Sequence, residues 1–114
     1  MRLRFWLAAA ALSLAGGAAH AASFDCLKAT SPDERAICAD RSLNDQDVRM
    51  GLLYELTQHL VPMGTRDNMK GEQRQFLIDR RACGARKMCL NALYVNRLGV
   101  LGAVMTRVEQ NGPF

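Results

Sequence analysis

Apolar residues recur every three or four positions from residue 31 to residue 108, which is typical of helices that bury one face. A short helix is expected from Ser31 to about Ala39, because Ser31-Pro32-Asp33-Glu34 combines a capping serine, a first-turn proline and the glutamate of a capping box. A second helix is expected from a cap at Ser42 to about Leu60, where Val61-Pro62-Met63-Gly64-Thr65 ends it.

A third helix is expected from a cap at Asp67 to about Ala82, and a fourth from about Lys87 to Val108. No strand pattern is longer than a few residues. The sequence therefore predicts an all-α fold, a small bundle of one short and three longer helices.

Each longer helix has one stripe of positions that would face the core. The stripe of the second helix holds Leu43, Asp47, Met50, Leu53, Tyr54, Leu56 and Leu60. That of the third holds Met69, Gln73, Phe76, Leu77 and Arg80, and that of the fourth holds Leu90, Leu93, Tyr94, Arg97, Val100, Leu101, Val104 and Val108.

Four polar residues interrupt these stripes, namely Asp47, Gln73, Arg80 and Arg97. A half-buried charge costs free energy unless it has a partner. We therefore predict a buried polar contact in which Asp47 meets Arg97 or Arg80 across the bundle. Gln73 and Arg80 are expected to join this contact or to face its rim. The alternative is that these groups bind a partner.

The first 21 residues have the pattern of a secretory signal peptide. Arg2 and Arg4 supply the positive start, residues 5–15 are apolar, and Ala19-His20-Ala21 has the small-x-small pattern of a cleavage site. Because about 20 apolar residues are needed to cross a bilayer, the alternative of a membrane anchor fits less well, and no membrane span is expected. The predicted organisation is a signal peptide over 1–21, a helical domain over 22–110 and a loose tail over 111–114.

The chain after residue 21 contains four cysteines, Cys26, Cys38, Cys83 and Cys89. An exported chain folds in an oxidising compartment, where cysteines pair. Local pairing, Cys26 with Cys38 and Cys83 with Cys89, would staple the short helix and the corner between the last two helices. Four cysteines allow three connectivities, and the spacing does not choose among them. A zinc site fits poorly, because there is no C-x-x-C pair and His59 is the one histidine after the signal peptide.

The charge is moderate and unevenly distributed. The chain has 15 basic and 11 acidic residues, and loss of Arg2 and Arg4 leaves a net charge of +2, which does not suggest a nucleic-acid binder. Residues 22–67 carry a net charge of −3 and residues 68–114 one of +5. The sequence has no glycine-rich phosphate loop and no serine–histidine or metal motif, so neither an enzyme nor a bound cofactor or metal is expected.

Several segments together resemble the LprI-type lysozyme-inhibitor domain, over about residues 23–101. They are Ser23-Phe24-Asp25-Cys26; residues 31–40 (SPDERAICAD); Leu43, Asp47, Met50 and Tyr54; Glu72-Gln73-Arg74; Phe76-Leu77; Arg80; Cys83-Gly84; Cys89-Leu90; Tyr94; and Arg97. The resemblance implies a small, helical, disulfide-bonded, secreted domain of bacterial envelopes. One branch of that family is associated with inhibition of host lysozyme.

The sequence departs from this family pattern in three places. Phe76 stands where tryptophan is usual, Arg81 stands where aspartate is common, and the lipid-attachment cysteine of the lipoprotein members is missing. The last departure implies a soluble protein in the periplasm or outside the cell.

Two binding functions follow as expectations. The first is inhibition of a lysozyme-like muramidase, with contacts from the acids of the first half, chiefly Asp33, Glu34, Asp40 and Asp45. The net charge of +2 counts against steering toward a cationic enzyme. The second is an envelope structural or adaptor protein that binds a protein or cell-wall partner through its basic second half, chiefly through Arg74, Arg81, Arg86 and Lys87.

Overall fold

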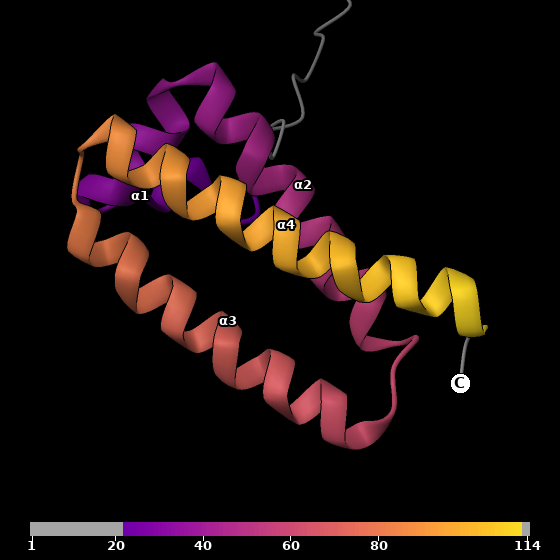
Figure 1. Ribbon diagram of the computed structural model, residues 1–114. Coiled ribbons are helices and arrows are strands. Elements are labelled where there is room, and N and C mark those ends of the chain that lie inside the picture. The colour runs from indigo at the N-terminus through magenta and orange to yellow at the C-terminus, as the bar shows by residue number, and fades with distance from the viewer. Residues whose placement is uncertain (1–21, 113–114) are drawn as a thin grey trace, which may run out of the picture.

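The computed structural model describes residues 22–112. In this part of the chain, a 3-10 turn, η1 (Cys26–Lys28), is followed by the helices α1 (Pro32–Ala39), α2 (Arg41–Gln58), α3 (Met63–Cys83) and α4 (Lys87–Asn111) (Figure 1). The predicted all-α bundle of one short and three longer helices is confirmed. The predicted signal peptide over 1–21 lies outside the described residues. Of the predicted tail over 111–114, Asn111 is the last residue of α4, and residues 113–114 lie outside the described residues.

Two predicted helix starts are wrong. Asp40, and not Ser42, caps α2, because its carboxylate accepts a hydrogen bond from the backbone N–H of Leu43 at 3.0 Å. α3 begins at Met63, four residues before the predicted cap at Asp67. The predicted stop at residues 61–65 is correct, because α2 ends at Gln58. The same segment also opens α3: Pro62 precedes this helix, where the lack of a backbone N–H costs no helical hydrogen bond.

The predicted capping box at the start of α1 does not form. The Ser31 side chain makes no capping bond, and the Glu34 carboxylate accepts instead from the backbone N–H of Thr30 at 3.4 Å. Pro32 occupies the first turn of α1 as expected.

The core lies mainly between α2 and α4, which pack along one another (Figure 1). The chain turns back after α3 ends at Cys83 and continues as α4. The predicted stripes supply most of the buried apolar residues, which include Leu43, Met50, Met69, Phe76, Leu90, Tyr94, Leu101, Val104 and Val108. Three stripe residues, Leu56, Leu77 and Val100, are instead exposed, because they lie at the edges of their stripes.

Both disulfides follow the local pairing. Cys26–Cys38 joins η1 to the end of α1, and Cys83–Cys89 joins the end of α3 to the first turn of α4. At this corner the Arg86 side chain donates hydrogen bonds to the carbonyl oxygens of Cys83 at 3.0 Å and Ala82 at 3.3 Å. These bonds satisfy carbonyl groups that the end of α3 leaves free.

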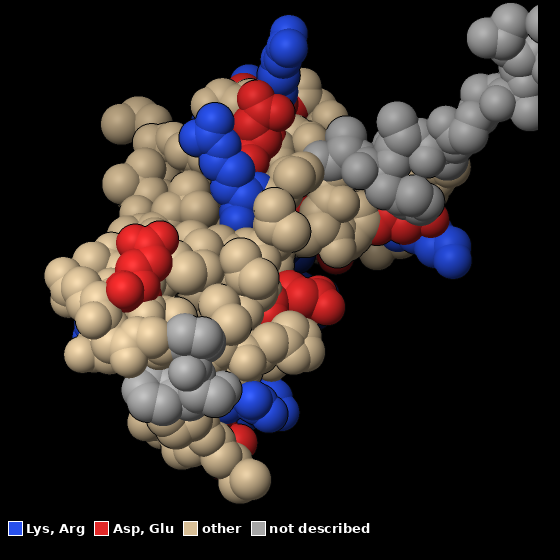
Figure 2. All heavy atoms as spheres, turned by 90° about the vertical axis from the view of Figure 1, so that its right-hand side faces the viewer, with Lys and Arg blue, Asp and Glu red and all other residues tan. Residues whose placement is uncertain are grey.

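The end of the bundle where α4 stops faces the viewer in Figure 2. Uncharged residues cover most of this face, and acidic and basic side chains alternate among them (Figure 2). The visible surface therefore offers neither an acidic protrusion nor a continuous basic face.

Candidate functional site

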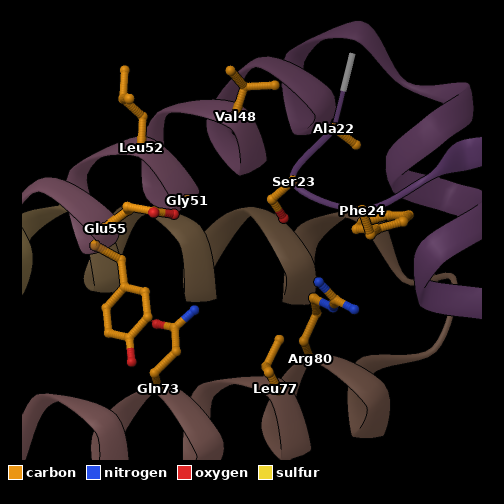
Figure 3. A pocket seen from close by; sticks show the side chains of 11 residues that line it. Ala22, Ser23, Phe24, Val48, Gly51, Leu52, Glu55, Gln73, Leu77 and Arg80 are labelled. Atoms are coloured by element: carbon orange, nitrogen blue, oxygen red, sulfur yellow. The ribbon is translucent and has the colours of Figure 1, made fainter. Parts of the chain in front are cut away.

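A groove of about 670 Å³ lies between α2, α3 and the N-terminal segment 22–24 (Figure 3). Gln73, Leu77 and Arg80 rise into it from α3. Its other lining residues come from α2 and the N-terminal segment, and they are Ala22, Ser23, Phe24, Val48, Gly51, Leu52, Tyr54 and Glu55.

An exposed row on α2 borders this groove. Asp45, Val48, Leu52 and Glu55 are three or four residues apart and therefore share one side of the helix. We call them the α2 ridge. Val48 is 40% exposed and Leu52 is 70% exposed, and both acids are exposed. The exposed Arg49 lies beside the ridge.

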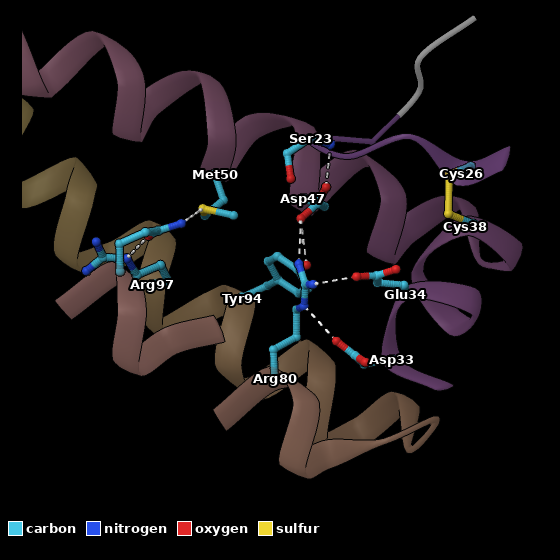
Figure 4. Close-up of polar contacts among 11 residues, drawn as sticks. Ser23, Cys26, Asp33, Glu34, Cys38, Asp47, Met50, Arg80, Tyr94 and Arg97 are labelled. Atoms are coloured by element: carbon cyan, nitrogen blue, oxygen red, sulfur yellow. Dashed lines mark hydrogen bonds and ion pairs between the residues drawn. A yellow bond between two sulfur atoms is a disulfide. The ribbon is translucent and has the colours of Figure 1, made fainter. Parts of the chain in front are cut away.

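A buried polar cluster lies behind the groove, around Asp47 (Figure 4). The Asp47 carboxylate is fully buried and accepts hydrogen bonds from the Tyr94 hydroxyl at 2.7 Å and from the backbone N–H of Ser23 at 2.6 Å. The Arg80 guanidinium lies 3.8 Å from the same carboxylate. Asp47 thus joins α2 to α3, to α4 and to the N-terminal segment.

Arg80 also binds α1. Its Nε donates to the Asp33 carboxylate at 2.9 Å, and a terminal nitrogen lies 3.8 Å from the Glu34 carboxylate. The guanidinium carbon stands 5.1 Å from the centre of the Phe24 ring, a cation–π distance. One buried arginine therefore holds α1, α2 and the N-terminal segment against α3.

These surroundings shift three ionisation equilibria. Burial and the neighbouring Asp47 carboxylate raise the pKa of the Tyr94 hydroxyl well above its usual range. Burial raises the pKa of Asp33, but the neighbouring Ser31 hydroxyl and the Arg80 guanidinium lower it by a larger amount. The pKa of Asp33 therefore lies below its ordinary value. Burial lowers the pKa of Arg80, whereas its acidic neighbours Tyr94 and Asp33 raise it, and the raising effect is larger.

Arg97 belongs to a second network. It donates to the Gln73 side-chain oxygen at 3.0 Å, to the Glu72 carboxylate at 3.2 Å and to the Met69 carbonyl at 3.5 Å. The Gln73 amide nitrogen is 3.2 Å from the Met50 sulfur. Of the two partners predicted for Asp47, the structure therefore selects Arg80, and Gln73 joins Arg97 instead.

The sequence did not identify Asp33 or Tyr94 as members of the Asp47 cluster. The sequence placed Asp33 in the first turn of a helix and predicted that it contacts a partner. Asp33 is instead 1% exposed and paired with Arg80, so the predicted contact with a partner is wrong. Tyr94 stood on a predicted apolar stripe, and its hydroxyl was the available signal, because a buried tyrosine hydroxyl usually has a hydrogen-bond partner.

The other acids predicted to contact a partner differ in whether they are already paired within the chain. Glu34 is partly buried near Arg80, while Asp40 caps α2 and pairs with Lys87 at 3.1 Å. Asp45 is exposed, and within residues 22–112 it has no ion-pair partner.

Of the basic residues predicted to contact a partner, two are paired within the chain and two are not. Arg86 caps the end of α3 and Lys87 pairs with Asp40, so both have partners within the chain. Arg74 and Arg81 are exposed on α3, and in the described part of the chain neither forms an ion pair.

No group of three metal-binding side chains gathers within residues 22–112. The four cysteines are all disulfide-bonded, so the zinc alternative lacks its thiolate ligands. One described helix, α4, is long and apolar enough by length and composition to cross a membrane. It packs on α2 as a core helix, and its Arg97 is paired with α3.

Comparison with known proteins gave no match among protein families, characterised proteins or solved structures. The similarity to the LprI-type domain therefore remains a prediction from the residues quoted above.

Proposed function

We propose that this protein is an exported protein-binding module that inhibits a lysozyme-like muramidase, and that the α2 ridge with its groove is the binding surface. The observation that carries the proposal is the row of exposed apolar residues flanked by acids. Exposed apolar side chains that lie together beside a groove are typical of protein-interaction sites. The acids at the two ends suit a basic enzyme, although the whole chain is weakly basic.

The scaffold supports a binding role. The two disulfides indicate folding in an oxidising environment. The predicted signal peptide would deliver the chain to the periplasm or to the outside of the cell. The Arg80 ion pairs and the Asp47 hydrogen bonds hold all four helices together behind the groove, so the binding surface would be preorganised.

A muramidase assay tests the proposal. Oxidised protein comprising residues 22–114, added in molar excess, should slow the clearing of a bacterial cell suspension by lysozyme. Leu52→Asp should abolish this inhibition, because it places a charge in the apolar centre of the ridge. Glu55→Lys should weaken it by reversing a charge that faces the basic enzyme.

The matched control is Val95→Asp. Val95 is 57% exposed on α4 and lies outside the groove lining, so this variant should inhibit like the unmodified protein. Unchanged clearing at a large excess of folded protein would reject muramidase inhibition. Equal inhibition by the Leu52→Asp variant would reject the α2 ridge as the site.

The alternative is an envelope adaptor that binds cell-wall material through α3. It is favoured by the exposed Arg74 and Arg81, which have no ion-pair partner within residues 22–112. In a sedimentation assay, the protein should then pellet with purified peptidoglycan, and the Arg74→Glu/Arg81→Glu variant should stay in solution. Absence of the protein from the pellet would reject this alternative.

A further inference from the structure

The cluster around Arg80 holds more negative than positive charge. Three carboxylates, those of Asp33, Glu34 and Asp47, have oxygens 2.9 to 3.8 Å from this one guanidinium. The side chains of Asp33 and Asp47 are almost completely buried. Because buried charges without partners are costly, this arrangement favours a second cation nearby.

The N-terminal segment reaches this cluster. The backbone nitrogen of Ser23 donates to the Asp47 carboxylate at 2.6 Å, and Phe24 packs on Arg80. A Cβ atom added at Gly51 would come within 2.8 Å of the Ser23 Cβ, so the segment is seated closely on α2. Adjacent backbone nitrogens are at most about 3.6 Å apart, so the Ala22 nitrogen lies within about 6 Å of the Asp47 carboxylate.

We propose that the α-ammonium group created at Ala22 by removal of residues 1–21 is the second cation of this cluster. The inference requires the predicted cleavage after Ala21. Hydrolysis breaks the bond between the Ala21 carbonyl carbon and the Ala22 nitrogen. Water supplies the hydroxyl that leaves Ala21 with a carboxylate, and the Ala22 nitrogen becomes an amine that takes up a proton at neutral pH.

Cleavage thus converts a neutral amide into a positive group beside Asp47. The new charge would hold residues 22–24 against α2 and α3, where they form one wall of the groove. Removal of the leader would therefore both release the protein and complete its groove.

The sign of one pKa shift distinguishes this role from simple burial. Burial and the positive Arg80 both lower the pKa of an amine, whereas nearby carboxylates raise it. The charged and titratable groups of the cluster are Asp33 and Glu34 from α1, Asp47 from α2, Arg80 from α3 and Tyr94 from α4. We expect the carboxylates to dominate, because they outnumber the guanidinium.

Protein that begins at Ala22 is labelled with 13C-alanine, and the Ala22 signal is followed by NMR as a function of pH. The pKa of the α-amino group should lie about one unit above its ordinary value of about 7.7–8.0, which is a tenfold gain in proton affinity. Asp47→Asn should return it toward that range, and Glu34→Gln should lower it by less. Asp45→Asn, an exposed control on the same helix, should leave it unchanged.

A pKa at or below the ordinary range in the unmodified protein would overturn the proposal, even if the Asp47→Asn variant did not fold. Mass spectrometry showing that the exported protein begins elsewhere would also overturn it. Neither result depends on the muramidase assay, so this inference and the proposed function can fail separately.

Discussion

Replacing Asp47 by alanine tests the buried polar cluster most directly. This carboxylate is fully buried and accepts hydrogen bonds from Tyr94 and Ser23, and it lies 3.8 Å from Arg80. Each buried donor left without a partner costs about 1–3 kcal/mol. Removal of one member of a buried ion pair costs about 3–5 kcal/mol.

These effects overlap, since they describe the same carboxylate, so we expect the free energy of unfolding to fall by about 3–5 kcal/mol in total. For a domain of this size, each kcal/mol lowers the melting temperature by about 4–8 °C, so the melting temperature should fall by roughly 12 °C or more. Urea denaturation followed by circular dichroism, together with thermal melts, measures both quantities.

Two further variants show whether the loss arises from the cluster. Tyr94→Phe keeps the ring that packs edge-on against Phe76 and removes only the hydroxyl, so it should cost about 1.5 kcal/mol. The Asp47→Ala/Tyr94→Phe double variant should be more stable than the sum of the single losses predicts. Asp45→Ala, an exposed control, should change stability by less than about 0.5 kcal/mol. A loss below about 1 kcal/mol for Asp47→Ala would refute this account of the cluster.

Three other predictions concern stability. Replacing Cys83 and Cys89 by serine should lower the free energy of unfolding by about 2–3 kcal/mol, because the disulfide restricts the unfolded chain over a separation of six residues. An unchanged midpoint in urea denaturation would contradict this. Gly99→Ala should stabilise the protein by about 0.5–1 kcal/mol, since an added Cβ meets no atom within 4 Å in the middle of α4; a lower melting temperature would contradict it. Because folding raises the pKa of Tyr94, its contribution to stability is complete below about pH 10 and is lost at higher pH. In a Tyr54→Phe background, absorbance at 295 nm should show no tyrosinate until the protein unfolds, and earlier ionisation of the folded protein would disprove the shift.

The sequence by itself determined the helical elements. Periodic apolar residues and the terminating signals near Val61 and Cys83 predicted four helices, and the helix order is as expected. Two helix starts differed from the predicted ones, because capping depends on side-chain geometry. Asp40 and Ser42 are both suitable capping residues, and only the folded backbone shows that Asp40 accepts the bond from Leu43.

The local disulfides could also be anticipated, since each pair is close along the chain and both pairings formed. Spacing alone still left three connectivities. The choice required the helices to bring each pair of sulfur atoms together at the two corners of the bundle.

Only the tertiary structure decided the partners of the buried polar residues. Periodicity places Asp47, Arg80 and Arg97 on inward faces, but it does not fix how far each helix is shifted or rotated against the next. That relative placement put Asp47 beside Tyr94, which lies 47 positions later in the chain, and near Arg80, which lies 33 positions later. It also brought Asp33 into the core. The α2 ridge has the same origin, because a helix face remains exposed only where no other helix covers it.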